Sequence, residues 1–241
     1  MPTSRLKTAI GAASLVGLLF LAGAVQAQER PPIAEKLAKT YGLDGFANVE
    51  AIRFTFSAQL PAIDVSRAWT WETKTGQVTY QGKDKSGKAV TVTYSRSQPD
   101  TQGAEIEPWF VNDEYWLLLP FHATWDYGAT IEDIGPQKLP VGDGSAEKVV
   151  MRYPSSGASS SPGDTWDLYI GADGRIEAIT FHRGGSAKPN LVHASWTDYK
   201  KAGPLLFSLE HRGTADGQPL HVGFSNVAVK LAGSNDWIEA K

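Results

Sequence analysis

The stretch from Trp109 to Asp126 reads WFVNDEYWLLLPFHATWD and contains three of the eight tryptophans of the sequence. It also contains the apolar run Leu117-Leu118-Leu119 and almost no turn-forming residues. Aromatic side chains at this density bury large areas when a chain folds. We therefore expect this stretch to form the centre of the core or to line a cavity in it.

The apolar spacing within the stretch predicts a short helix over about Asn112 to Leu119. Phe110, Glu114, Leu117 and Leu118 fit one helical stripe. Pro120 is expected to end this helix, because proline lacks a backbone donor and clashes with the preceding turn.

Upstream, Ile33, Leu37 and Tyr41 stand at positions i, i+4 and i+8. This spacing predicts an amphipathic helix over residues 33–41, and Gly42 is a suitable stop. From Val49 the period of the apolar residues changes to two, which is typical of strands with one buried face.

Alternating segments then recur along the chain. They span residues 49–56, 67–73, 77–81, 90–94, 149–153, 166–170, 175–181, 191–199, 205–212 and 220–231. Asp173-Gly174 supplies the positive-φ residues of a tight hairpin turn. Residues 128–144, rich in Gly, Pro and acidic side chains, are expected to be a loop, as is the serine-rich segment 155–163.

These elements together predict an α+β fold that is mainly β. Consecutive hairpins without βαβ alternation indicate an antiparallel sheet that curls over helices. We expect a curved sheet or unclosed barrel of about ten strands, packed over the N-terminal helix and the short central helix.

The N-terminus has the features of a secretory signal peptide. Arg5 and Lys7 precede an apolar segment from Ile10 to Val25, and Val25-Gln26-Ala27 fits the small-x-small cleavage rule. The apolar run is short for a membrane span, although an uncleaved anchor is the alternative. The sequence predicts cleavage after Ala27 and a periplasmic or secreted protein that does not span the membrane.

Residues 28–241 are long enough for one core and short for two full domains, so we expect a single globular domain that is a monomer. Loss of the leader takes the formal net charge from −3 to −5, and no Lys/Arg run stands out. A nucleic-acid partner is therefore not expected. There is no cysteine, hence no disulfide and no site for lipoprotein acylation.

Motifs for chemistry are scarce. Nucleophile elbows and phosphate-binding glycine loops are absent, so no catalytic residue and no cofactor is assigned. Strand parity puts His182, His193 and His221 on the non-core face of one sheet. A three-histidine metal site is conceivable, but the histidines lack local ligand spacing, and we expect no metal.

The strongest functional feature is the number of aromatic residues on the predicted core face and in the central stretch. A curved sheet around apolar helices favours an apolar cavity on its concave face. The alternative is that these aromatic residues only fill the core. The candidate ligand-binding residues are Phe54, Phe56, Trp69, Trp71, Trp109, Trp116, Phe121 and Trp125.

A resemblance rests on residues 112–122, NDEYWLLLPFH, with Trp125-Asp126 after them. Trp69-x-Trp71, Tyr153-Pro154, Asp167-Leu168-Tyr169 and His182-Arg183-Gly184-Gly185 agree with it. Over most of residues 45–240 the chain resembles an uncharacterised family of exported bacterial proteins, a domain of unknown function. More distantly it is similar to the periplasmic lipoprotein-carrier fold. The resemblance implies an unclosed barrel that holds acyl chains, and no catalytic residues.

Three functions follow as hypotheses. The first is an exported protein that binds a hydrophobic or lipid-like molecule in the concavity of a half-barrel. The second is an interaction module with a curved sheet surface. The third is an exported hydrolase that uses His122 with Asp113 or Asp126, because these carboxylates lie close to His122 in the sequence.

Overall fold

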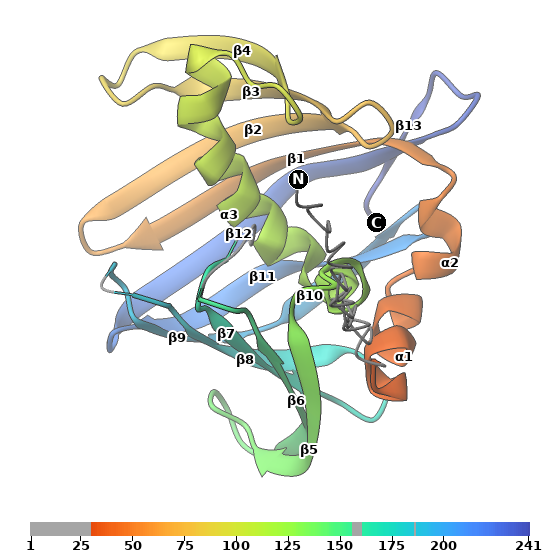
Figure 1. Ribbon diagram of the computed structural model, residues 1–241, viewed down its shortest axis with the longest axis vertical. Coiled ribbons are helices and arrows are strands. Elements are labelled where there is room, and N and C mark those ends of the chain that lie inside the picture. The colour runs from red at the N-terminus through yellow and green to blue at the C-terminus, as the bar shows by residue number, and fades with distance from the viewer. Residues whose placement is uncertain (1–29, 156–160, 186) are drawn as a thin grey trace, which may run out of the picture.

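The computed structural model describes residues 30–155, 161–185 and 187–241. The predicted leader and most of the serine-rich segment lie outside the described residues. Within them, one large antiparallel sheet curves around a long helix, α3 (Thr101–Trp125), which crosses its inner face (Figure 1).

The sheet runs from the β4 edge to the β5 edge in the order β4-β3-β2-β1-β12-β11-β9-β8-β7-β6-β5, with β10 paired to β11 and β13 to β12. The first four strands are β1 (Val49–Leu60), β2 (Ile63–Glu72), β3 (Gln77–Lys83) and β4 (Ala89–Ser95). The middle group is β5 (Thr130–Lys138), β6 (Ser145–Arg152), β7 (Thr165–Ile170) and β8 (Ile176–His182). The last are β9 (Leu191–Ser195), β10 (Thr197–Ala202), β11 (Leu205–Ala215), β12 (Gln218–Leu231) and β13 (Trp237–Glu239).

This topology confirms the predicted unclosed antiparallel sheet. The described chain forms 13 strands where about ten were expected. The two halves of the chain meet at the β1–β12 ladder, in which Phe56 stands opposite Phe224 and Ala58 opposite Val222. Antiparallel pairing along the whole path lets one face collect the apolar side chains.

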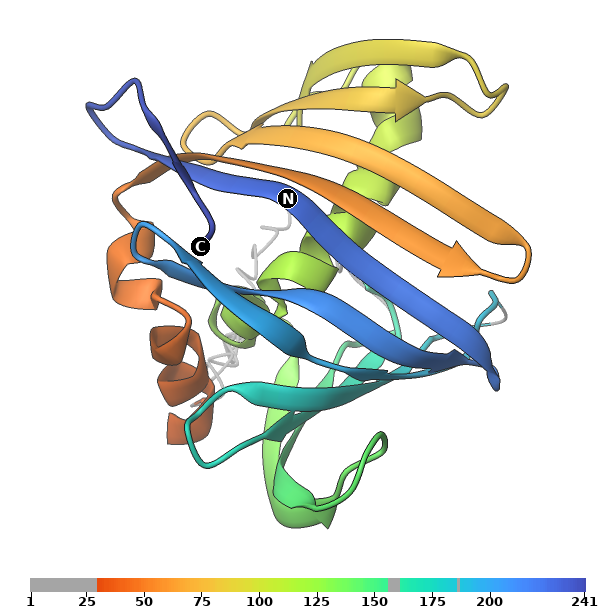
Figure 2. The same cartoon turned by 180° about the vertical axis from the view of Figure 1, so that it is seen from behind.

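The alternation of the strands decides which face is buried. On β1, Phe54, Phe56 and Ala58 point inward, and Arg53 and Thr55 point outward. Seen from behind, the strands lie in front of α3, and no described helix covers this outer face (Figure 2). The core therefore lies between the inner face of the sheet and the helices.

The central helix corrects the prediction. It begins at Thr101, where the Asp100 side chain accepts a hydrogen bond from the Gly103 N–H at 2.7 Å, and it continues through Pro108 and Pro120. An interior proline costs stability and bends a helix, but here burial on the sheet outweighs that cost. Figure 1 shows the last turns of α3 almost end-on after its lengthwise run.

The loop expected at residues 128–144 is also corrected, because it contains β5. This strand is at the edge of the sheet and is mostly exposed. Gly135, at φ +81°, lies at a register shift in its pairing with β6. Edge strands tolerate Gly, Pro and charged residues that central strands exclude, so the composition of this segment resembled that of a loop.

The N-terminal helix is confirmed as α1 (Pro32–Thr40), followed by the short α2 (Leu43–Phe46). Leu37 and Tyr41 are buried. Both helices lie at the end of the sheet opposite the β1–β2 turn (Figure 1). The Tyr41 hydroxyl accepts a hydrogen bond from the Ile176 N–H at 2.9 Å and lies 2.8 Å from the Tyr199 hydroxyl. None of the described helices has the length and apolar character needed to cross a membrane.

Candidate ligand-binding cavity

A cavity of about 630 Å³ lies between the middle of α3, from Pro108 to Trp116, and the inner face of the sheet. On α3, Trp109, Asn112 and Trp116 face it, because residues three, four and seven apart share one side of a helix, and Tyr115 lines it beside Trp116. Most of its lining is apolar, with Phe56 from β1 and Leu220 from β12 among the residues opposite α3. Its volume lies within the ~300–1,000 Å³ typical of small-molecule sites.

The cavity has an exposed rim and a buried floor. Ile63, at the β1–β2 turn, is 47% exposed, and the Lys188 side chain is 68% exposed. Tyr115, Trp116 and Trp166 are at most 7% exposed. The β1–β2 and β11–β12 turns lie on one side of the molecule, at the left in Figure 1, and the rim is on that side.

The structure brings together part of the predicted aromatic set. Phe56, Trp109 and Trp116 line the cavity. The remaining residues are packed elsewhere, namely Phe54, Trp69, Trp71, Phe121 and Trp125.

Phe121 and Trp125 illustrate this packing at the far end of α3. Their rings stack at 5.1 Å between centroids, and both contact Phe46 of α2. Trp125 is therefore a partly buried tryptophan of the same helix as Trp109, but outside the cavity.

Asp113 joins α3 to β2 beside the cavity. Arg67 donates two hydrogen bonds to its carboxylate at 2.7 and 2.6 Å, and Trp69 Nε1 donates a third at 2.9 Å. Burial raises the pKa of Asp113, and the Arg67 guanidinium opposes that rise. Arg67 lines the cavity, but its charge is matched by this bidentate contact.

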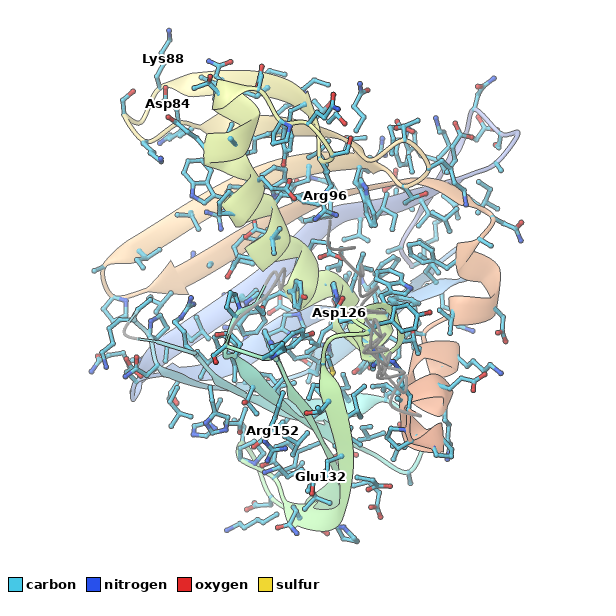
Figure 3. The ribbon with its side chains drawn as sticks, in the orientation of Figure 1. Asp84, Lys88, Arg96, Asp126, Glu132 and Arg152 are labelled. Atoms are coloured by element: carbon cyan, nitrogen blue, oxygen red, sulfur yellow. The ribbon has the colours of Figure 1, made fainter. Side chains whose placement is uncertain are left out.

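A second buried network lies behind Tyr115, at the end of α3 that Asp126 marks in Figure 3. His122 Nε2 lies 3.1 Å from both Glu114 oxygens, and His122 Nδ1 lies 3.0 Å from Asp126 Oδ2. Burial alone would lower the pKa of His122, but the two carboxylates outweigh it and raise the pKa to about 9. The imidazole is therefore a charged, doubly paired group at neutral pH.

Asp126 is the centre of this network. Its Oδ2 also accepts hydrogen bonds from the Tyr115 and Tyr153 hydroxyls at 2.7 and 2.6 Å. Burial alone would raise the pKa of Asp126, but His122 and the two hydroxyls hold the pKa below its ordinary value. The Tyr115 ring stacks on His122 at 3.7 Å, so the network fixes one part of the cavity floor.

Arg30 closes the same end of α3. Its Nη1 donates to the Ala123 carbonyl at 2.6 Å, and its Nη2 donates to the Asp126 carbonyl. These are carbonyls at the end of the helix, where a cation is favoured. The polar network is therefore shielded on this side as well.

His122 has no free ring nitrogen with which it could act as a general base. Both ring nitrogens face carboxylates, and the residue does not line the cavity. Asp113 is paired with Arg67 rather than with His122. This arrangement fixes the floor and gives His122 no access to a ligand in the cavity.

A second buried histidine lies behind Trp116. The His211 ring centroid is 3.8 Å from that of Trp196 and 5.6 Å from that of Trp116. Burial among these rings lowers the pKa of His211 to about 3, so it is neutral in the folded protein. Alternation along β11 predicts that His211 points inward. It does not predict the aromatic neighbours of His211, because Trp116 and Trp196 lie outside β11.

The outward histidines do not form one site. His182 pairs with Asp167 at 3.3 Å, His193 with Thr180 at 2.9 Å, and His221 with Glu210 at 2.8 Å. β11 separates the strand of His221 from that of His193. Among the described residues, no group of three or more His, Asp or Glu is placed to hold a metal ion.

A second hollow, of about 1090 Å³, lies over β2, β3 and β4. It shares Val65, Arg67 and Trp109 with the first cavity, so the two meet at these side chains. About half of its lining residues are polar or charged, among them Lys83, Lys85, Asp64 and Asp84. Most residues that line the first cavity are apolar, so the first cavity is the better candidate for an apolar ligand.

Neither the family models nor the curated proteins searched contain a match to this sequence. Similar solved structures include a DUF1329 family protein from Desulfovibrio piger, at 7% identity and a TM-score of 0.47, over 85% of this chain and 94% of that one. Lipoprotein LppX of Mycobacterium tuberculosis is similar at 9% identity and a TM-score of 0.33, over 83% of this chain and 96% of that one.

The MucA/MucB complex of Pseudomonas aeruginosa is similar at 11% identity and a TM-score of 0.29. The match covers 86% of this chain and 60% of that one. These names carry no activity over to this chain, whose function has to be argued from its own residues.

Proposed function

We propose that this chain is an exported binding protein of the periplasm that holds a hydrophobic or lipid-like small molecule in the cavity beside α3. The observation that carries the proposal is a cavity of about 630 Å³, lined mainly by apolar side chains and open at one end. A largely preformed apolar cavity with a few polar groups at its rim is the usual form of a small-molecule site.

The polar groups behind the cavity support a binding role. The His122 and Asp113 clusters are paired and buried, and they hold the cavity-lining residues Tyr115 and Arg67 in place. A wall built in this way keeps its shape in the absence of ligand, which lowers the entropic cost of binding. The basic residues, apolar segment and Val25-Gln26-Ala27 of the N-terminus support export.

The test is the affinity for an uncharged hydrocarbon chain, measured by isothermal titration calorimetry with dodecanol. Trp109→Ala removes a cavity wall and should weaken binding about tenfold, which corresponds to ~1.4 kcal/mol. Trp125→Ala is the matched control, because it removes a partly buried tryptophan from the same helix outside the cavity. It should leave the affinity unchanged.

Equal affinities of W109A and W125A, or no binding by the native protein, would overturn the proposal. Should W109A unfold, Val65→Phe serves as the second variant. Val65 is half-buried on β2 and lines the cavity. A larger side chain there should fill the space and weaken binding without leaving a void behind.

A further inference from the structure

Arg183 lies at the rim of the cavity with its charge unmatched. Its Nε donates to the Pro189 carbonyl at 3.0 Å, and its Cζ lies 5.3 Å from the centroid of Phe181, which lines the cavity. Within the described chain no carboxylate forms an ion pair with it. A half-buried guanidinium without an anionic partner is uncommon, because the charge is costly to remove from water.

The loop after β8 is built to hold Arg183 at this place. A Cβ on Gly184 would lie 2.4 Å from the Pro162 carbonyl oxygen and 2.6 Å from the Gly163 carbonyl carbon, so the close approach requires glycine. The Gly184 N–H donates to Asp164 Oδ1 at 2.7 Å. These contacts fix the backbone at Gly184 against residues 162–164, and with it the position of the preceding Arg183.

The other cations that line the cavity have carboxylate partners. Arg67 is matched by Asp113, and Lys188 Nζ lies 3.8 Å from Asp216 on the exposed side. Among the described residues that line the cavity, Asp164 is the only acidic one. Of the cations that line the cavity, Arg183 is thus the one without an ion pair among the described residues, while the walls deeper in the cavity are apolar.

We propose that Arg183 binds the anionic head group, a carboxylate or a phosphate, of an amphiphile whose hydrocarbon chain lies in the cavity. This inference rests on the function proposed above and gives its ligand a class. A guanidinium presents paired N–H donors that match either anion. With Nε held by Pro189, the terminal N–H groups of Arg183 are available to the head group.

The experiment compares dodecanoate, dodecyl phosphate and dodecanol by calorimetry on the native protein and on Arg183→Gln. The native protein should bind both anions at least about tenfold more tightly than dodecanol, the contribution of one charge-assisted hydrogen bond. R183Q should lose this preference and keep its affinity for dodecanol. The ratio of dodecanoate to dodecyl phosphate affinity distinguishes the two head groups.

Two further variants separate this contact from general charge effects. Arg152→Gln makes the same change at an exposed arginine that pairs with Glu132 on β5, low in Figure 3 and outside the cavity, and it should keep the preference. Asp164→Asn retains an oxygen for the Gly184 N–H and removes the opposing charge. It should tighten dodecanoate binding and leave dodecanol unchanged.

The outcomes distinguish the two proposals. Equal affinities for anion and alcohol in the native protein, or a preference that survives in R183Q, would overturn the role of Arg183 while the cavity proposal stands. Failure of the native protein to bind dodecanol and both anions would overturn the cavity proposal itself.

Discussion

At the scale of single residues, the sequence predicted which face of the sheet a side chain occupies, but not whether that side chain lines the cavity. Alternation placed Phe54, Phe56, Trp69 and Trp71 on one side of the sheet, and all four point inward. Only Phe56 of these lines the cavity, because the path of α3 decides which inward side chains it covers. That path depends on contacts between distant parts of the chain, which periodicity does not encode.

The charged residues of the site show the same division. Asp113 and His122 stood out in the sequence as candidates for chemistry, and the fold pairs both of them internally. Arg183 stood out only as part of the segment His182-Arg183-Gly184-Gly185 that supported the resemblance, and its place at the rim depends on the contact of Gly184 with Gly163. The available signal in the sequence for this site was an arginine followed by a glycine shortly after the predicted strand 175–181.

His211 makes stability depend on pH. Its pKa is about 3 in the folded protein, below the ordinary 6.5, so the unfolded chain takes up a proton first as the pH falls. Stability is therefore lost from about pH 6.5 downward. His211→Phe should remove this dependence. As the pH falls from 7 to 5, the unfolding free energy of the variant should rise by about 2 kcal/mol relative to that of the native protein.

The measurement is the urea-unfolding free energy of both proteins at the two pH values. His122 shifts in the opposite sense, with a raised pKa of about 9, and it is present in both proteins, so it cancels in the difference. A difference between H211F and the native protein that is the same at pH 7 and pH 5 would show that His211 is not held neutral.

At the scale of elements, the strands with one wet face followed from period two, and the exceptions have physical causes. β5 was missed because an edge strand needs no continuous apolar face. The length of α3 was missed because Pro120 is a strong local stop. The Asp100 side chain, which caps the helix at Thr101, was the local signal that places its true start.

The start of α3 is fixed against β4 by a close contact at Gly103. A Cβ on Gly103 would lie 2.6 Å from Cβ of Tyr94, and Glu107 is held by the Tyr94 hydroxyl at 2.7 Å and by Arg96 at 2.8 Å. Alanine normally stabilises a helix by about 1 kcal/mol relative to glycine. Here we expect Gly103→Ala to destabilise the protein, by roughly 1–3 kcal/mol of overpacking.

Urea unfolding of G103A beside Gln102→Ala checks this contact. Gln102 is exposed one position earlier on the same helix turn, so alanine there should be neutral or slightly stabilising. If G103A proved more stable than the native protein, α3 would not lie as close to β4 as described.

At the scale of the whole molecule, the cavity is a consequence of the unclosed sheet. The β1–β12 ladder joins the two halves, α1 and α2 cover one end, and α3 crosses the inner face (Figure 1). The helix crosses the concavity, and the cavity lies between its middle part and the β1–β2 and β11–β12 turns at the opposite end. A ligand would enter past Ile63 and Lys188 and extend toward Trp116.

The most direct test of this account is native mass spectrometry of the protein, purified without detergent and measured before and after incubation with dodecanoate. We expect a single added dodecanoate per chain on the native protein, and a reduced bound fraction on W109A but not on W125A. A native protein that remains at its unliganded mass after incubation, and from which no amphiphile can be extracted, would contradict the central claim that the cavity is a binding site.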